Sequence, residues 1–339
     1  MSKFSRILVT GASGFLGANI IKYLVDRNVC VLATSRKLVD PLMDFYLKGS
    51  ENYVDWIKVD VSDYKQVMGI AKNYSIDGVI HAAFVTPGLG IEYSRSRNIL
   101  NSNINGTINV LELAKKTDLK KFVFTSSSGV YPSSNDVNKT VLENSIEAYT
   151  NMKGLYHISK ITCEKIVERY SQLFSFSGTS MRIPVIYGPM ERPTNSRINM
   201  SPVFKLFNLV LKENIKNINI YGLKYASDWT YVMDVVQGLV AALDSDKPLR
   251  PVYNISCGER YYLVNFLNAL KNVSEFEFSW KEVDKMEEAD YSTPINRMRG
   301  PLNIEKAKQD FEFKPKYDPK EGIFEYYKWW TEVTKKDLW

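Results

Sequence analysis

The 339-residue sequence has little of the chemistry that metal sites, disulfides and membrane spans require. It contains two histidines and three cysteines, and Cys30, Cys163 and Cys257 stand far apart, in no spacing typical of zinc ligands. Thiols without a pairing pattern favour a reduced, cytoplasmic setting. No apolar run approaches the length of a membrane span, and the polar residues 1–6 do not begin a signal peptide. We therefore expect a cytoplasmic protein with no bound metal and no membrane anchor.

The chain is neither strongly basic nor strongly acidic. Lys and Arg number 44 against 38 Asp and Glu, a formal net charge of +6. The basic residues are scattered rather than gathered into a run, which indicates a solvated surface and not a nucleic-acid interface. A modest positive field nevertheless favours a phosphorylated small molecule as the ligand.

The first half of the chain alternates short apolar runs with helical patterns. Strands that are apolar throughout and alternate with helices indicate a parallel sheet covered on both faces. We therefore predict a doubly wound α/β fold with ligands at the carboxyl ends of the strands. The patterns predict strands at 7–10, 29–33, 56–61, 78–83 and 122–125, and helices at 15–26, 64–73, 99–116 and 155–174.

The pattern loosens after residue 180, where prolines punctuate the chain and the helices become short. We expect the sheet domain to span residues 1–180 and a smaller, mainly substrate-binding lobe to span 181–339. A strand near 252–256 is expected to return to the main sheet.

A glycine-rich turn lies between the first strand and the first helix. Its glycines permit a tight turn, let the backbone approach a pyrophosphate, and let the helix pack closely on the strand. The helix N-terminus adds free N–H groups and the positive end of the helix dipole. This context predicts a dinucleotide-binding Rossmann domain, with cofactor contacts from Gly11, Ser13, Gly14, Phe15, Leu16 and Gly17.

The end of the second strand indicates which dinucleotide is bound. A ribose 2′-hydroxyl is usually held there by Asp or Glu, whereas a 2′-phosphate needs a cation. This chain has Ser35 and Arg36 at that point and no carboxylate. A hydroxyl and a guanidinium suit a phosphate, so NADP is favoured and NAD stays possible.

Two tyrosines are followed by a lysine four residues later, Tyr149 by Lys153 and Tyr156 by Lys160. Positions i and i+4 share one face of a helix. A cation there lowers the tyrosine pKa from its usual value near 10, which makes the phenol a usable acid or base. Gly154 weakens any helix through the first pair, so the second pair is the better candidate.

The glycine-rich turn and the Tyr–Lys pair belong to a series of short motifs that occur in a fixed order along the chain. Together they resemble the extended short-chain dehydrogenase/reductase family, of the NAD-dependent epimerase/dehydratase type that modifies nucleotide sugars. The resemblance covers essentially the whole chain. It rests on residues 10–17, 60–61, 81–83, 103–107, 126–131 and 156–160, and on 182–189, 228–234 and 303–308 in the substrate half.

The resemblance implies roles for individual residues. Ser127 would hydrogen-bond the reacting oxygen, Tyr156 would exchange its proton, and Lys160 would bind the nicotinamide ribose and hold the tyrosine pKa down. Asn103 would order water or Lys160, unless it only caps its helix. His157 follows Tyr156 on a helix and is expected to face elsewhere. Further cofactor contacts are implied at Asp60, Val61, Ala82 and Ala83, with His81 packed beside the cofactor.

The sequence also departs from the family pattern. Dehydratases carry an Asp–Glu pair where this chain has Ser128 and Gly129, and decarboxylases carry Glu at the second of these positions. Without a carboxylate to remove a carbon-bound proton, both reactions are disfavoured. What remains is reduction or oxidation at the 4-keto or 4-hydroxyl carbon of a nucleotide-linked sugar, which the NADP preference favours, or 4-epimerisation with bound NAD.

Substrate recognition is less clearly encoded. An arginine that commonly precedes Asp228 is Ser227 here. Ser128, Arg182 and Arg299 are the expected substrate contacts, the arginines through phosphate. A smaller hydroxy acid or aldehyde is an alternative substrate, and a non-catalytic dinucleotide sensor is an alternative class, although it would not need the Ser–Tyr–Lys set.

The predicted helices over 99–116 and 155–174 also resemble those that pair in the family's dimers. A homodimer with two-fold symmetry is therefore expected.

Overall fold

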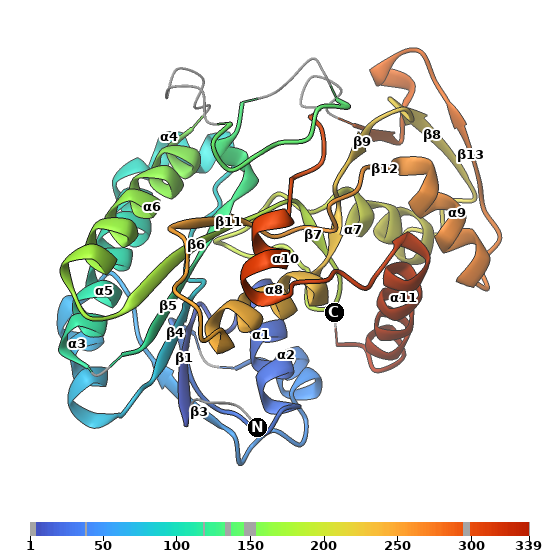
Figure 1. Cartoon of the computed structure of the whole chain (residues 1–339). Helices are drawn as coiled ribbons and strands as arrows, with labels where there is room; N and C mark the ends of the chain where they lie inside the picture. Colours follow the sequence, from blue (N-terminus) through green and yellow to red (C-terminus); the bar gives the residue numbers. More distant parts are fainter. Residues whose placement is uncertain are drawn as a thin grey trace.

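The computed structural model describes residues 5–37, 39–117, 119–132, 137–145, 154–293 and 299–338. Within these residues the centre is a seven-stranded parallel sheet of order β11-β6-β5-β4-β1-β2-β3 (Figure 1). The strand order reverses at β1, so the predicted doubly wound arrangement is confirmed. The strands are β1 (Arg6–Thr10), β2 (Cys30–Ser35), β3 (Val54–Lys58), β4 (Gly78–His81), β5 (Lys121–Ser127), β6 (Ser177–Ile183) and β11 (Val252–Asn254).

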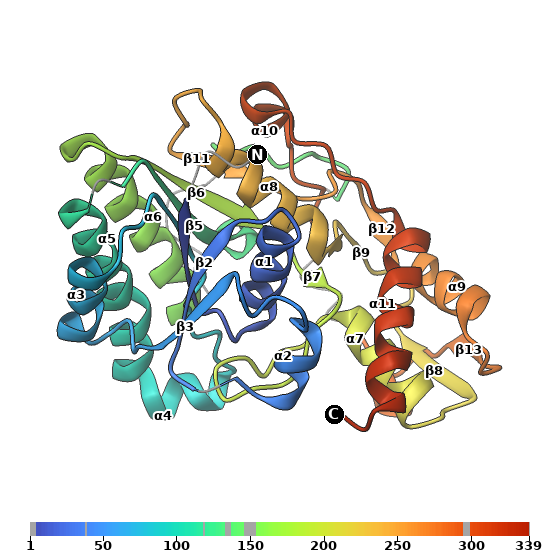
Figure 2. The same ribbon diagram turned by 90° about the horizontal axis from the view of Figure 1, so that it is seen from below.

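Successive strand residues enter two different cores, one on each face of the sheet. In β1, Ile7 and Val9 belong to one core and Leu8 to the other. Because both faces are covered, the central residues Ile7–Val9 are all apolar rather than alternating. Figure 2 shows the covering helices, with α1 (Phe15–Val25) and α8 (Val232–Asp244) on one face and α3 (Tyr64–Asn73), α5 (Gly106–Lys116) and α6 (Leu155–Leu173) on the other.

The helix predicted over 99–116 starts earlier and is interrupted. α4 (Leu89–Leu100) runs into one π-helical turn, Asn101–Asn105, and α5 continues from it. Such turns are uncommon and often mark functional sites. Neither α4 nor the short α2 (Pro41–Tyr46) was expected from the sequence.

A lobe built mainly from the second half of the chain lies beside the sheet (Figure 2). Its small sheet has the order β13-β8-β14. The division at residue 180 stays a prediction, but β11 does pair with β6, and α8 packs on α1. The lobe contains α7 (Pro202–Phe207), β8 (Asn217–Tyr221), α9 (Leu263–Val273), β13 (Ser279–Glu282), β14 (Tyr291–Ser292), α10 (Glu305–Phe311) and α11 (Pro319–Lys335).

The closing helix α11 is amphipathic. Asp318 caps it and exchanges hydrogen bonds with Glu321 in a capping box. On its inner face Tyr326 stacks on Phe207, with ring centroids 4.4 Å apart, so these aromatics are core residues. Across the described residues, no helix is long and apolar enough to cross a bilayer.

Candidate active site

The phosphate turn depends on glycine at two close approaches. Gly11 has φ +68°, and a Cβ there would lie 2.7 Å from the Ala82 carbonyl oxygen and the Ala83 nitrogen. A Cβ on Gly17 would collide with the backbone of Gly11. Gly14 precedes α1 and provides no side-chain cap, so a ligand can take the N–H groups of the first turn.

The ends of β1 and β4 are joined beneath this turn by a buried hydroxyl. Thr10 Oγ1 accepts hydrogen bonds from the Ala82 and Ala83 nitrogens, each at 3.2 Å, and lies 2.6 Å from His81 Nδ1. His81 is fully buried, and burial lowers its pKa to about 3. The buried imidazole is therefore uncharged at neutral pH and packs beneath the glycine turn, and its place beside the cofactor stays a prediction.

The region predicted to bind the adenosine half lies at the ends of β2 and β3. Ser13 Oγ and Ser35 Oγ are 2.5 Å apart and join the turn to β2, and Arg36 is exposed beyond them. At the end of β3, Asp60 Oδ1 accepts from the Ser62 nitrogen at 2.9 Å. The following residue, Val61, is held through its carbonyl oxygen, which accepts from Asn109 Nδ2 at 2.9 Å.

The structure brings the predicted Ser–Tyr–Lys set together at the carboxyl end of β5. Ser127 ends this strand, and Tyr156 and Lys160 lie one turn apart on α6. The side chains of Ser127 and Thr86 both lie close enough to the Tyr156 hydroxyl to lower its pKa. Thr86, on the loop after β4, is a contact that the sequence did not reveal.

The electrostatics of the pair differ from the expectation. Burial raises the Tyr156 pKa, and the opposing effects of Ser127, Arg197 and Thr86 do not overcome it. Burial also lowers the pKa of Lys160 to about 7. The Lys160 ammonium donates to the Thr125 carbonyl at 2.5 Å and lies 5.6 Å from the Tyr156 ring centroid. In this structure Lys160 therefore does not lower the tyrosine pKa as predicted.

Asn103 lies inside the π turn and is fully buried. Its amide accepts from the Val85 nitrogen at 2.8 Å and donates to the Val85 carbonyl at 3.2 Å. Because the helix continues through this point, Asn103 is not a cap. It fixes the loop that carries Thr86, and its predicted role toward Lys160 remains an expectation.

His157 points toward the site, and the expectation that it faces elsewhere is wrong. Its ring meets Tyr156 edge-on at 5.3 Å between centroids. A Cβ on Gly129 would lie 2.8 Å from His157 Nε2 and 3.2 Å from Ser127 Oγ, so the imidazole covers Gly129 beside Ser127. The absence of a side chain at 129 is the signal that could have revealed this neighbour.

Two predicted substrate residues meet each other beside Ser127. Arg299 Nη1 donates to the Ser128 carbonyl at 2.5 Å, and its Nη2 donates to the Ser128 hydroxyl. Burial raises the pKa of the nearby Asp228 carboxyl, while the charge of Arg299 opposes that rise. A cation is therefore fixed next to the reacting groups.

Arg182 has a structural role instead of the predicted contact with substrate phosphate. Its guanidinium donates to both carboxylate oxygens of Glu164, at 2.9 and 2.6 Å, to Tyr131 Oη at 3.0 Å and to the Glu143 carbonyl at 2.7 Å. Both partners of the ion pair are almost completely buried, at 3% and 1% side-chain exposure. This geometry leaves no face of the guanidinium open to a ligand.

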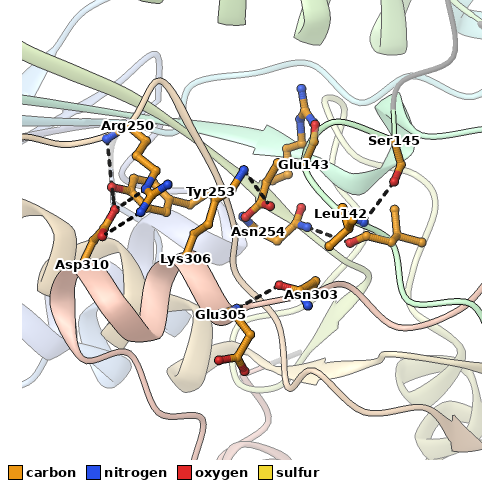
Figure 3. A network of polar contacts seen from close by, with 12 residues as sticks. Leu142, Glu143, Ser145, Arg250, Tyr253, Asn254, Asn303, Glu305, Lys306 and Asp310 are labelled. Carbon is orange, nitrogen blue, oxygen red and sulfur yellow. Dashed lines mark hydrogen bonds and ion pairs between the residues drawn. The ribbon is translucent and has the colours of Figure 1, made fainter.

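The same network extends to the edge of the main sheet. Asn254 on β11 donates its backbone N–H to Glu143 Oε1 at 3.2 Å, and Lys306 pairs with Glu143 Oε2 at 3.1 Å (Figure 3). These contacts join β11, α10 and the segment 137–145. The rival tyrosine pair, Tyr149 and Lys153, lies outside the described residues.

Comparison with known proteins assigns the chain to a family. Residues 7–256 match the NAD dependent epimerase/dehydratase family. The chain belongs to this family. The predicted resemblance is thereby confirmed, and so is the prediction of an enzyme.

Curated relatives match over nearly the full length. The UDP-glucuronate 4-epimerase of Thermodesulfobacterium geofontis is 27% identical, with 96% of each chain covered. The human dTDP-D-glucose 4,6-dehydratase is also 27% identical, over 96% of this chain and 90% of its own.

Among solved structures, the UDP-glucose 4-epimerase of Thermotoga maritima with UDP-glucose has a TM-score of 0.78. It is 22% identical, with 97% of this chain and 99% of its own covered. The UDP-glucuronic acid 4-epimerase of Bacillus cereus with NAD has a TM-score of 0.77 at the same identity, covering 97% of both. At this identity the likeness shows the fold.

Proposed function

We propose that this family member is an NAD-dependent nucleotide-sugar 4-epimerase. One observation carries the proposal. The hydroxyls of Ser127 and Thr86 lie near that of Tyr156, at the same edge of the sheet as the glycine turn. A single proton-exchanging group beside a dinucleotide site suits the oxidation of one secondary alcohol.

Residues of this chain would bind the 4-hydroxyl oxygen of the sugar and exchange its proton. Tyr156 takes the proton from the 4-hydroxyl as the carbonyl forms, and Ser127 hydrogen-bonds the same oxygen. Bound NAD would supply the chemistry of hydride acceptance and return. Tyr156 would give the proton back to the same oxygen as the 4-epimer forms. The reaction then involves no net oxidation or reduction.

Elimination of water is not supported by the same site. Loss of water from an oxidised sugar needs a base for a carbon-bound proton. The positions beside Ser127 that would hold it are Ser128 and Gly129, and neither is a carboxylate. Although one relative is a dehydratase, epimerisation is therefore the better-supported reaction.

A nucleotide sugar is the proposed substrate. Arg299 fixes a cation beside the reacting groups, and the relatives described above act on UDP and dTDP sugars by name. The test is to incubate the protein with NAD⁺ and UDP-glucose, UDP-glucuronate or dTDP-glucose, and to separate the products. We expect a 4-epimer from at least one of them. If turnover occurs only with a 4-keto sugar and added NADPH, the protein is a reductase.

Net oxidation or reduction with NADP is the second candidate, favoured by one feature. Arg36 is exposed just beyond the Ser13–Ser35 contact, where a 2′-phosphate would lie. On this proposal Arg36→Ala weakens NADPH binding about tenfold or more and leaves NADH binding nearly unchanged. Exposed Lys48 provides a control, because Lys48→Ala removes the same charge elsewhere. If the parent protein binds NADH and NADPH with equal affinity, the proposed preference for NADP is refuted.

A homodimer through α5 and α6 is also proposed. A hollow of about 440 Å³ on the outer face of α6 is lined by side chains that include Ile161, Ile166 and Tyr170. On the same helix Leu173 is 54% exposed. An apolar face of this kind suits a two-fold contact. Light scattering at micromolar concentration should give twice the chain mass, and Ile166→Glu should give a monomer. A parent protein that is monomeric refutes the proposal.

A further inference from the structure

A short turn from the lobe is attached to the loop that carries Thr86. Thr194 and Arg197 exchange backbone hydrogen bonds of 2.8 and 3.1 Å, which close the turn. The Thr86 nitrogen then donates to the Ser196 carbonyl at 2.8 Å. Ile198 packs so closely on Gly88 that a Cβ there would collide with it. The backbone of Arg197 is therefore fixed beside the carboxyl end of β4.

The guanidinium of Arg197 is held from one side. Its Nη2 donates to Glu191 Oε1 at 2.8 Å, and its Cζ lies 5.0 Å from the centre of the Phe15 ring. Glu191 is fully buried and also accepts from the Ser201 nitrogen and hydroxyl, each at 2.7 Å. The arginine side chain itself keeps 27% exposure. A buried carboxylate thus anchors a partly exposed cation through one of its N–H donors.

The position of this cation relates it to both halves of the site. Phe15 is the first residue of α1, the helix whose N-terminus follows the phosphate turn. The charge of Arg197 also lowers the pKa of the Tyr156 hydroxyl. Its Nε is buried and has no hydrogen-bond partner among the described residues. The guanidinium therefore lies beside the first turn of α1, acts on the reacting group through its charge, and has an unpaired N–H donor.

The other arginines near the site have partners within the chain. Arg182 is enclosed by Glu164, and Arg299 is bound to Ser128 through both Nη atoms, although its buried Nε also has no hydrogen-bond partner among the described residues. Arg192, on the same segment as Arg197, pairs at 2.5 Å with Asp40 at the start of α2. A guanidinium with unpaired N–H donors favours an oxyanion as its ligand.

We propose that Arg197 is an oxyanion-binding residue of the active site. The oxyanion is a phosphate of the dinucleotide or an anionic group of the sugar nucleotide. Glu191 acts as a positioning residue, because it holds the guanidinium and does not itself meet the ligand. Binding of a dinucleotide phosphate by Arg197 is independent of the proposed function. Binding of an anionic group of the sugar nucleotide rests on the proposed function.

The test uses the full chain with Glu191→Gln and Arg197→Gln combined, which neutralises the pair without leaving a buried charge unpaired. Thermal unfolding checks that this double variant folds. If it does not fold, Arg197→Lys is used in its place, because lysine keeps the positive charge but lacks the guanidinium donors. Arg192→Gln is the matched control. Dissociation constants are measured for NADH, and then for UDP-glucose and UDP-glucuronate with NAD⁺ present.

We expect the double variant to weaken at least one of these probes tenfold or more, while Arg192→Gln changes each less than twofold. Loss for NADH assigns the contact to the dinucleotide phosphate. Loss for both UDP sugars assigns it to the sugar diphosphate, and loss for UDP-glucuronate alone to a sugar carboxylate. Unchanged affinities for every probe that the parent binds, or equal losses in Arg192→Gln, overturn the proposal. If the parent protein binds NADH but no sugar nucleotide, the proposed function is contradicted. The NADH affinities of the variants then still test the contact of Arg197 with the dinucleotide.

Discussion

Replacing Tyr156 with phenylalanine is expected to lower turnover by roughly 10²–10⁴-fold, the usual contribution of a positioned general acid or base. Phenylalanine keeps the ring and its edge-on contacts with Phe84 and His157. Only the hydroxyl beside Ser127 and Thr86 is removed. Dinucleotide affinity should barely change, because the glycine turn is untouched. Steady-state kinetics and an NADH titration together measure both effects.

Two further tyrosine variants make this prediction specific. Tyr170→Phe, on the same helix, removes a hydroxyl that donates to Glu112 away from the site, and should be nearly silent. Tyr149→Phe tests the rival pair and should also be nearly silent. Ser127→Ala should lower turnover less than Tyr156→Phe, since it removes a hydrogen bond and not the proton carrier. A damaging Tyr149→Phe with a harmless Tyr156→Phe would move the catalytic role to the rival pair.

Replacing Arg182 with leucine is expected to destabilise the protein by about 3–5 kcal/mol, the typical loss when one partner of a buried ion pair is removed. Glu164 would keep its buried carboxylate and its hydrogen bond from Ser126, at 2.5 Å, but lose both guanidinium donors. The Tyr131 hydroxyl would lose a donor as well. The free energy of unfolding from urea titration measures the effect.

An exposed ion pair provides the matched control. Arg250 pairs with Asp310 at 2.6 Å but keeps 47% side-chain exposure (Figure 3). Water screens such a pair, so Arg250→Leu should destabilise the protein far less than Arg182→Leu. If Arg182→Leu is as mild as Arg250→Leu, the Arg182 guanidinium is not structural. A contact between Arg182 and a substrate phosphate, as the sequence predicted, would then be the better interpretation.

The features that sequence reasoning predicted are those that a short segment encodes by itself. The parallel sheet follows from strands that are apolar throughout, and the turn follows from Gly11, Gly14 and Gly17 between a strand and a helix. The register of Tyr156 and Lys160 follows from helical spacing. The short α2, with its Pro41 start, and α4, whose apolar residues are few, have weak patterns and were missed.

The features that were missed depend on partners far apart in the sequence. Arginine is usually exposed, so nothing local reveals that Arg182 is enclosed by Glu164 and by the segment containing Glu143. His157 turns toward the site because Gly129 leaves room on a different element. Arg197 gains its position through the buried Glu191, which looks like any surface carboxylate in the sequence. Tertiary packing decides each of these outcomes.

The measurement that tests the central claim most directly follows the hydrogen at C4 of the sugar. The protein is incubated with NAD⁺ and UDP-glucose or UDP-glucuronate carrying deuterium at C4, and the product is analysed by mass spectrometry and NMR. Because an epimerase returns the same hydride, we predict a 4-epimer that retains the deuterium at C4. A product that has lost the label to the dinucleotide pool, with net NADH or NADPH formed, would contradict epimerisation and show a dehydrogenase instead.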